Sequence, residues 1–316
     1  MDLLMVVEKS SLGSMVRLNA GNQATLYSVP SYRHPKIGTE VVFKEYKRSL
    51  LADHGAALAN GLPLIVDYPD GLSEARRKDL LSVTVWPRDV VVDGGRLVGI
   101  LMGRIQDPFW FEMRGKQLPF SLKMLCDAPT QIRKRGLAVP SRSDLVGLTI
   151  RLIYALHLIH DNDLVVGDLS GNNVVLTNPA LFSGGFRVKF LDVDSFRLAD
   201  SAPPIPQGDA GQWRTPETMA VEEEAAKIGG FRAEMLLAQG QVRTRSTDIF
   251  KLGLAIIRLF DETEDAALTY SIDDAAPRIR QAFPADAATL LLRMVTAAPD
   301  GRPTTRMLLQ ALMPKR

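Results

Sequence analysis

The sequence contains a single cysteine, Cys126, and only four histidines among its 316 residues. One cysteine excludes an intramolecular disulfide framework, and no His or Cys spacing is typical of a zinc site. Long apolar runs are also missing, because no stretch reaches the roughly 18 apolar residues that cross a bilayer. The first residues, MDLLMVVEKS, carry no basic leader before an apolar core, so no signal peptide is predicted. We therefore expect a soluble cytoplasmic protein that has no membrane partner.

A strong charge of one sign is absent as well. The formal net charge is only +2, from 38 Lys and Arg against 36 Asp and Glu. This balance gives no electrostatic basis for nucleic acid as the main partner. Hydrophobic residues make up 46% of the chain and charged residues 23%, which allows a full core and excludes global disorder. The length suits one large domain or two smaller ones that share a cleft.

The first third of the chain has the patterns of a small sheet with one helix. Residues 14–29, SMVRLNAGNQATLYSV, predict two short strands around a polar turn. VVFKEY at residues 41–46 alternates like a strand. VTVWPRDVV, the glycine pair at 94–95 and RLVGILMGRI predict two more antiparallel strands, and this pattern ends near Gly103. A helix is predicted over SEARRKDLLSV, with Ser73 as its N-cap.

Three residues of this region have both a structural and a functional interpretation. Gly21 lies in the turn AGNQ, which is either a tight polar hairpin or a loop whose N–H groups cover phosphates. Lys44 is flanked by apolar residues, so it either snorkels to the sheet edge or points into a cleft toward phosphates. Glu74, on the predicted helix, is a candidate partner of Lys44 because its side chain reaches further than that of Asp79. The preceding LADHGAALANG allows a short helix, and Pro63 is expected to break the pattern after it.

The remaining two thirds of the chain are predicted to be mostly helical. DLVGLTIRLIYALHLIHDN is apolar on all sides and is expected to be a buried helix capped by Ser143 or Asp144. TDIFKLGLAIIRLF predicts a second apolar helix, capped by Ser246 or Thr247. Between them lie the strand-like segments VVLTN and RVKFLDVDSF and a long loop at residues 197–217. The segments IDDAAPRIRQAF, ADAATLLLRMV and TTRMLLQALM complete the helical part.

The loop VVGDLSGNN, at residues 165–173, contains the main candidate residues for a reactive site. Asp168 and Asn173 come after an apolar helix, and Asp192 stands at the end of a later strand-like run. This order is typical of a phosphate-transfer site, in which one Asp orients a hydroxyl while an Asn and a second Asp hold a metal ion.

Taken together, these segments resemble a protein kinase of the eukaryotic type over residues 14–312. GDLSGNN resembles the catalytic loop H-R-D-L-x-x-x-x-N in the spacing of Asp168 and Asn173. VKFLDVD resembles the strand that leads into the D-F-G motif, so that Asp192 takes the metal-binding position and Asp194 is a competing candidate.

Further motifs come in the order of the family. VVFK resembles V-A-I-K and supplies Lys44, while LNAGNQATL resembles the glycine-rich loop with Gly21 as its middle glycine. TPE, with Glu217, resembles A-P-E, and Arg302 resembles the arginine that pairs with this glutamate. Asp248 resembles the helix acid that supports the backbone of the catalytic loop. The motif DVDSF is similar to one found in divergent bacterial kinases of the tellurite-resistance-neighbourhood type.

The resemblance implies an α+β, bilobal protein kinase-like fold. Residues 1–103 would form a mainly β N-lobe that covers the nucleotide, and residues 104–316 a mainly α C-lobe. The implied hinge carries Met102, Gly103 and Ile105, which would receive the adenine.

The resemblance also implies ATP and Mg²⁺ as cofactors and transfer to a Ser or Thr hydroxyl of a protein substrate or of the chain itself. Lys44 would hold the α- and β-phosphates, and Glu74 would pair with Lys44. Asn173 and Asp192 would hold Mg²⁺, whose preferred ligands are oxygens. Asp168 would accept the proton of the attacking hydroxyl.

Several positions depart from the family pattern. Val166 and Gly167 replace the His and Arg before the catalytic Asp, which removes the arginine that docks a phosphorylated activation loop. Ser170 replaces a lysine that helps to neutralise the transferred phosphate. Asn19 and Ala24 replace the first and third glycines of the phosphate loop.

These departures leave two alternatives open. A pseudokinase would bind nucleotide and act as a scaffold with little transfer. A small-molecule kinase of the aminoglycoside phosphotransferase type would share the loop H-G-D-x-x-x-x-N, chiefly through Gly167.

Overall fold

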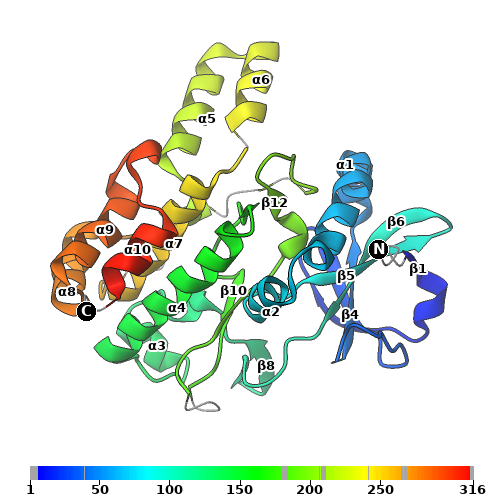
Figure 1. The fold of residues 1–316 in the computed structure, drawn as a ribbon, viewed down its shortest axis with the longest axis horizontal. Coiled ribbons are helices and arrows are strands. Elements are labelled where there is room, and N and C mark those ends of the chain that lie inside the picture. Colours follow the sequence, from blue (N-terminus) through cyan, green and yellow to red (C-terminus); the bar gives the residue numbers. More distant parts are fainter. Residues whose placement is uncertain are drawn as a thin grey trace. The chain divides into compact units, whose positions relative to one another are not determined.

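The chain forms two compact units in a computed structural model that describes residues 6–38, 40–179, 184–205, 207, 211–240, 242–264, 266 and 269–313 (Figure 1). The first unit comprises Met1–Gln106 and Leu191–Pro206, and the second comprises Asp107–Phe190 and Gln207–Arg316. A segment from the second half of the chain therefore completes the first unit. The functional division into lobes at residues 103 and 104 stays a prediction.

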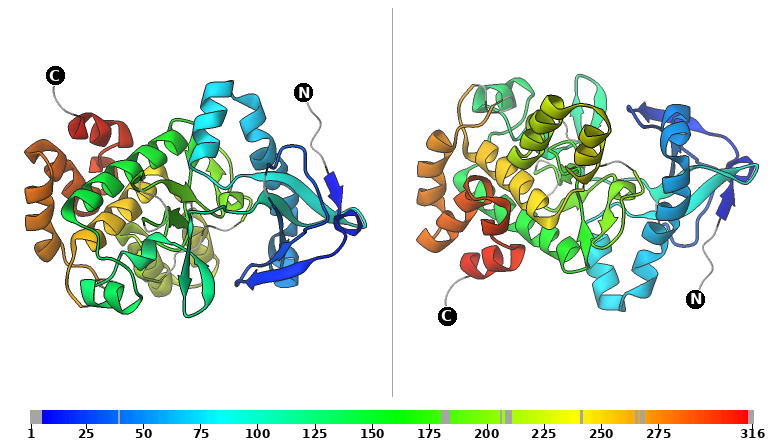
Figure 2. Two further views of the ribbon diagram at one scale, coloured as in Figure 1. Left: turned by 90° about the horizontal axis from the view of Figure 1, so that it is seen from below. Right: turned by 90° about the horizontal axis from the view of Figure 1, so that it is seen from above.

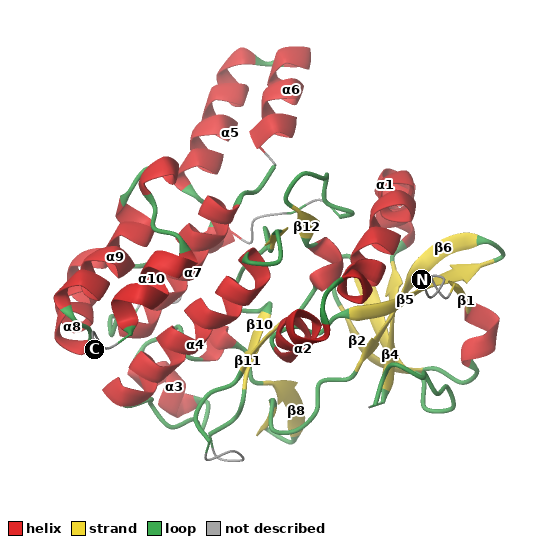
Figure 3. Cartoon of the chain, viewed as in Figure 1, coloured by secondary structure: helices red, strands yellow, loops and turns green. Residues whose placement is uncertain are grey.

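A six-stranded sheet is the framework of the first unit, in the order β1-β5-β6-β4-β3-β2 (Figure 3). β1 pairs with β5 in parallel, and the other pairs are antiparallel. The strands predicted for this region are confirmed, and β1 is an addition that was not predicted. The bounds are β1 (Val6–Glu8), β2 (Val16–Ala20), β3 (Ala24–Ser28), β4 (Val41–Tyr46), β5 (Pro87–Asp93) and β6 (Arg96–Gly103).

Helix α1 (Arg48–Asp67) corrects the expectation of a short helix interrupted near Pro63. The helix has 20 residues and contains Pro63 in its interior. Its buried side chains at Leu58, Leu62 and Val66 recur every four residues, so one face of the helix packs on the sheet (Figure 2). The stabilisation from this packing outweighs the low helix propensity of Pro63. Helix α2 (Glu74–Ser82) begins as predicted, because the Ser73 side chain accepts a hydrogen bond from the N–H of Arg76.

The two faces of this sheet belong to different hydrophobic clusters. On β4, Val41 and Phe43 belong to one cluster, whereas Tyr46 belongs to the cluster that includes α1. Since side chains alternate along a strand, Lys44 shares the face of Tyr46. Ile205, a buried residue of the completing segment, joins the same cluster as Tyr46. The segment also contains the short strand β12 (Arg197–Leu198) and the 3-10 turn η4 (Val193–Ser195).

Helices dominate the second unit, and α7 is its buried centre, with every residue from Thr247 to Phe260 buried. It packs against α4, α8 and α9, while α5 and α6 pack on each other as a hairpin (Figure 1). The predicted apolar helices are confirmed, whereas the hairpin of α5 and α6 was not predicted. The bounds are α3 (Pro129–Lys134), α4 (Arg142–His160), α5 (Pro216–Ile228), α6 (Gly230–Gly240), α7 (Arg245–Phe260), α8 (Ile272–Ala282), α9 (Ala285–Thr296) and α10 (Thr305–Leu312).

The two long helices begin earlier than the sequence suggested. The N-cap of α4 is Ser141, whose hydroxyl accepts the N–H of Asp144, while the Asp144 carboxylate accepts the N–H of Ser141. The N-cap of α7 is Thr244, which forms the same reciprocal arrangement with Thr247. The predicted caps, Ser143 or Asp144 for α4 and Ser246 or Thr247 for α7, were therefore wrong, although Asp144 and Thr247 are the second partners of the two capping boxes.

The second unit also contains short strands. β10 (Val174–Leu176) and β11 (Val188–Phe190) pair antiparallel, as the strand-like segments after the catalytic-type loop predicted. The hairpin of β7 (Trp110–Met113) and β8 (Lys116–Pro119) lies in a region for which no strand was predicted. β9 (Leu164–Val165) leads directly into the loop that carries Asp168.

Candidate functional site

Lys44, on β4, is the centre of a buried charge cluster in the first unit. Its Nζ donates to Oδ1 of Asp192 at 2.9 Å and to Oδ1 of Asp194 at 2.8 Å. Tyr46 donates its hydroxyl to Oδ2 of Asp194 at 2.8 Å. Because residues two positions apart share a strand face, Lys44 and Tyr46 reach the same carboxylate. The structure therefore brings together two of the predicted site residues, Lys44 and Asp192.

The surroundings fix the protonation states of this cluster. Burial by itself lowers the pKa of Lys44, but the charges of Asp194 and Asp192 outweigh burial and raise this pKa above its usual value. Burial, followed by the charge of Asp194, raises the pKa of the Tyr46 hydroxyl well above its usual value. At neutral pH, Lys44 is therefore a cation and Tyr46 is a neutral hydrogen-bond donor.

Asp192 and Asp194 lie on either side of one backbone turn but differ in exposure. Asp192 has a left-handed backbone (φ 52°), and its carbonyl accepts both the N–H and the hydroxyl of Ser195. The side chain of Asp192 is 48% exposed, whereas that of Asp194 is 2% exposed. A half-exposed carboxylate can exchange a partner for a cation. Asp194 is far less accessible to a cation, because its side chain is buried and its oxygens already accept hydrogen bonds from Lys44 and Tyr46.

In the second unit, the loop between β9 and β10 holds Asp168 and Asn173. Asn173 donates Nδ2 to the carbonyl of Asp168 at 2.9 Å and to Oδ2 of Asp168 at 3.3 Å. Its backbone N–H donates to the carbonyl of Ser170 at 3.1 Å. Since the amide nitrogen is the donor in these contacts, the side-chain oxygen of Asn173 is the atom that can ligate a cation.

Asp248 of α7 anchors this loop through the main chain. Its two carboxylate oxygens accept the N–H groups of Val166 and Gly167 at 2.9 and 2.8 Å. One of them also lies 3.0 Å from Nε2 of His160. Lys251, one turn along α7, donates to the carbonyl of Gly167 at 2.6 Å. The predicted support of the loop backbone by Asp248 is confirmed.

Gly167 shows why no larger side chain precedes Asp168. Its φ is +71°, which disfavours any residue with a Cβ. A Cβ built on Gly167 would lie 2.1 Å from the side-chain carbon of the Gln207 amide. The buried Gln207 donates Nε2 to the carbonyl of Val166 at 3.2 Å. The glutamine side chain therefore occupies the space beside the loop into which a side chain at position 167 would project.

The predicted pair of Glu217 and Arg302 is confirmed. The guanidinium donates to both oxygens of Glu217, each at 2.8 Å, and to the carbonyl of Ser246 at 3.1 Å. Burial raises the pKa of Glu217, but the hydrogen bonds and charge of Arg302 outweigh burial, and the pKa lies below its usual value. This bidentate pair ties the start of α5 to the start of α7 within the second unit.

The structure does not form the expected pair of Lys44 and Glu74. Glu74 is exposed in the first turn of α2. Among the described residues, the carboxylates bound to Lys44 are Asp192 and Asp194. The physical reason is that α1 comes directly after β4 and packs along the sheet, in the place where the sequence suggested the Glu74 helix.

The other predicted nucleotide contacts lie along the first unit's sheet. Gly21 opens the turn between β2 and β3, where its N–H donates to the carbonyl of Ala24 at 2.9 Å. Met102 and Gly103 are the last residues of β6 and pair in register with β4. Ile105 comes just after the strand. Binding of nucleotide by these four residues stays a prediction.

No role was predicted for Tyr46, Lys251 or Gln207, although the positions of Tyr46 and Lys251 in the sequence could have indicated their contacts. Tyr46 shares a strand face with Lys44, and Lys251 lies three positions after Asp248, on the same side of a helix. Gln207 had no such signal, because it lies in a loop whose path no local pattern determines.

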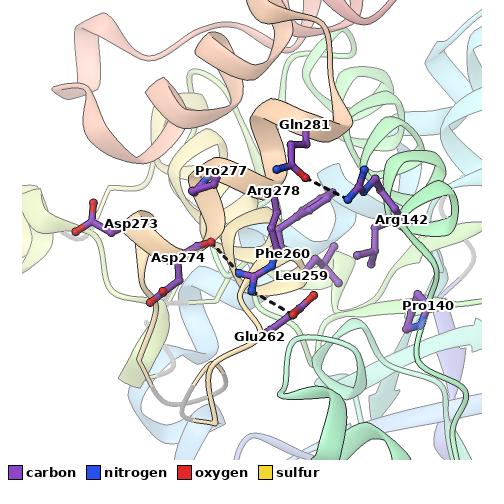
Figure 4. A pocket seen from close by; sticks show the side chains of 11 residues that line it. Pro140, Arg142, Leu259, Phe260, Glu262, Asp273, Asp274, Pro277, Arg278 and Gln281 are labelled. Carbon is purple, nitrogen blue, oxygen red and sulfur yellow. Dashed lines mark hydrogen bonds and ion pairs between the residues drawn. The ribbon is translucent and has the colours of Figure 1, made fainter.

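A pocket in the second unit lies apart from these residues (Figure 4). Arg142 at the start of α4 donates to Gln281 at 3.2 Å across it. Arg278 of α8 donates to Glu262 at 3.1 Å and to the carbonyl of Asp274 at 2.8 Å. Arg278 and Glu262 form an ion pair in the wall of this pocket, and none of the predicted site residues lines it.

Within the part of the chain that the structure describes, no group of three or more His, Cys, Asp or Glu side chains is placed to hold a metal ion. The described residues also include no helix with the length and apolar character that a membrane span requires.

Two comparisons with known proteins match kinases, and a third finds no match. No protein-family model matches the chain. A protein of Acanthamoeba polyphaga mimivirus, named as a putative serine/threonine-protein kinase, is 24% identical over 176 residues. The match covers 53% of this chain and 55% of the viral protein, so the chain spans about half the length of this curated relative. The crystal structure of a rhoptry kinase from Toxoplasma gondii matches at 18% identity with a TM-score of 0.55, over 94% of this chain and 76% of that one.

The chain has a protein kinase-like fold. The predicted α+β class, with a β-sheet unit and a helical unit, is confirmed. The assignment to a divergent bacterial type on the basis of DVDSF stays a prediction.

Proposed function

We propose that the protein is an ATP- and Mg²⁺-dependent kinase that transfers a phosphoryl group to a Ser or Thr hydroxyl of a protein substrate or of itself, in the cytoplasm. The observation that carries the proposal is the direct contact of Lys44 with Asp192 in a kinase-like fold. It joins a phosphate-binding cation and a metal-binding carboxylate, the two charges that phosphoryl transfer needs first.

Lys44 and Asp192 of the first unit, and Asn173 of the second, have side chains whose chemistry fits the nucleotide and its metal. Lys44 is a permanent cation whose ammonium group can turn from Asp192 to phosphate oxygens. The half-exposed carboxylate of Asp192 and the side-chain oxygen of Asn173 are hard oxygen donors suited to Mg²⁺. When bound, the metal would neutralise charge on the phosphates.

Asp168 would take the proton of the attacking hydroxyl. Its carboxylate accepts a hydrogen bond from Asn173 at 3.3 Å, which orients it without neutralising it. As the hydroxyl oxygen bonds to the γ-phosphorus, the bond to ADP breaks and the proton passes to Asp168. The anchored loop backbone would hold Asp168 in place during this step.

The test is transfer of labelled phosphate from ATP in the presence of Mg²⁺, either to the chain or to a general protein substrate. Asp168→Asn is compared with Asp163→Asn, which alters an exposed acid that pairs with Arg245 at 2.6 Å. We expect Asp168→Asn to lower kcat by about 10²–10⁴-fold and Asp163→Asn to leave it unchanged.

Other outcomes would support the alternatives. ATP-dependent thermal stabilisation without any transfer would identify a nucleotide-binding pseudokinase. Phosphorylation only of a small hydroxylated compound would identify a small-molecule kinase of the aminoglycoside phosphotransferase type. Equal transfer by Asp168→Asn and the wild type would overturn the role of Asp168.

A further inference from the structure

Asp194 has the contacts of a residue that holds Lys44 in place. It is 2% exposed, and each of its oxygens accepts one hydrogen bond, from Lys44 at 2.8 Å and from Tyr46 at 2.8 Å. Tyr46 is itself buried at 3% exposure, with its ring in the α1 cluster. Releasing a buried carboxylate with these two contacts is costly, because the buried Tyr46 hydroxyl would lose this hydrogen bond and Lys44 its buried counter-ion.

Asp192 has the opposite properties. It binds Lys44 through one oxygen at 2.9 Å, and its side chain is about half exposed. Losing this contact would leave the Asp192 carboxylate open to solvent or cation, and Lys44 would keep Asp194. The cluster therefore contains one contact that can exchange and one that cannot.

We propose that Asp194, oriented by Tyr46, is the permanent counter-ion that positions Lys44, while Asp192 exchanges Lys44 for the metal when nucleotide binds. This inference rests on the proposed function for its catalytic consequence. The two acids of one turn would then have different roles: Asp194 is the counter-ion of Lys44, and Asp192 is the metal ligand. Among the described residues, neither α1 nor α2 provides a carboxylate to Lys44. Helix α1 instead packs on the turn that carries Asp194 and on the ring of Tyr46.

The first experiment measures how fast an amine-reactive reagent modifies Lys44 at one fixed pH, without nucleotide, by peptide mass spectrometry. Asp194→Asn removes the permanent charge and is expected to raise the rate roughly tenfold. Tyr46→Phe removes only the hydroxyl, and we expect a rise of about two- to threefold. Glu74→Gln changes the acid that the sequence favoured and is the control, with no change expected. Circular dichroism and thermal unfolding show that each variant is folded.

The second experiment separates the two acids by their dependence on Mg²⁺. Asp192→Asn is expected to raise the Mg²⁺ concentration needed for ATP binding by roughly tenfold or more. Asp194→Asn is expected to leave this requirement nearly unchanged and to lower kcat, because Lys44 is misplaced rather than the metal.

The inference is overturned if Glu74→Gln exposes Lys44 as much as Asp194→Asn does, or if Asp194→Asn raises the Mg²⁺ requirement more than Asp192→Asn. If Asp194→Asn does not fold, Tyr46→Phe decides, since unchanged labelling of Lys44 in that variant would contradict the proposal. A wild type that transfers no phosphate would overturn the proposed function, whereas the labelling rates test the ion pair independently of transfer.

Discussion

Lys44 and Asp168, to which the sequence assigns the largest chemical roles, are held by different kinds of contact. Lys44 is held by side chains, since two carboxylates bind its ammonium group directly. Asp168 lies in a loop that is held by its main chain, through Asp248 and Lys251 at the backbone of Gly167. The side-chain contacts fix the position of the Lys44 charge, whereas the main-chain contacts fix the path of the backbone next to Asp168.

The difference predicts different responses to substitution. A cluster of side chains can exchange one partner for a ligand and still keep the other, so changes there should act mainly on binding and catalysis. A backbone anchor buried in the helical core has no such freedom, because a lost acceptor leaves N–H groups buried without partners. Changes to the anchor should therefore act mainly on stability.

The largest effect is expected for Asp248→Asn. The carboxylate offers one oxygen to each of two backbone N–H groups, whereas an amide has only one oxygen and turns an NH₂ toward the second donor. We expect the free energy of unfolding to fall by about 2–4 kcal/mol, as measured by urea denaturation. Asp163→Asn, at an exposed pair in the same unit, should change it by less than about 0.5 kcal/mol. Equal stability of the two variants would remove the distinction between backbone anchor and side-chain cluster.

A smaller loss is expected for Gly167→Ala. The new Cβ would meet the Gln207 side chain and would force alanine into a left-handed backbone. We expect a cost of about 2–3 kcal/mol, of which roughly 1 kcal/mol is backbone strain. The double variant Gly167→Ala with Gln207→Ala removes the steric part, so adding the second change should recover stability. If the cost of Gly167→Ala is the same with and without Gln207, the glutamine is not the group that fills this space.

The same comparison explains how far each region could be predicted from the sequence. The backbone anchor could be predicted from the resemblance, which matches Asp248 to the helix acid that supports the catalytic loop. The long apolar runs predicted the two helices that flank this region, although α7 is buried on all sides from Thr247 to Phe260 rather than along a single apolar stripe. Gln207 could not be predicted, since its place beside Gly167 depends on a loop path that no period determines.

The charge cluster was predicted only in part. The alternation of β4 identified the face of Lys44, and the strand-like run before Asp192 identified the acid. The preference for Glu74 failed because α1 was expected to be short, and a full-length α1 changes which helix packs beside β4. Tertiary packing outweighs the helix-breaking tendency of Pro63, because the helix that contains this residue buries one apolar face.

The pair of Glu217 and Arg302 sharpens the comparison, because it is a side-chain contact within the helical unit. The pKa of Glu217 is lowered in the folded state, which therefore favours the charged form of this side chain. The pair stabilises the fold fully above the usual pKa of 4.5. This stabilisation is lost as the pH falls through the lower pKa of the folded state. We expect Glu217→Gln to cost about 1 kcal/mol at pH 7, and almost nothing once the pH is below the folded pKa. Urea denaturation across this range measures it, with Glu223→Gln on the exposed side of α5 as the control. A cost independent of pH would show that packing rather than charge makes the contribution.

The smallest effect on stability is expected for Gly21→Ala, the counterpart of Gly167→Ala in the first unit. Gly21 has no left-handed φ, and a Cβ there would meet only the Ala24 carbonyl oxygen, at 3.9 Å. We expect the free energy of unfolding to change by less than about 0.5 kcal/mol. If the turn covers phosphates as the resemblance implies, the same variant should raise the KM for ATP, since the added methyl group would crowd a backbone that must approach the nucleotide. Unchanged stability with a raised KM would place the need for glycine in ligand binding. A stability loss above roughly 1 kcal/mol would place it in the folding of the hairpin instead.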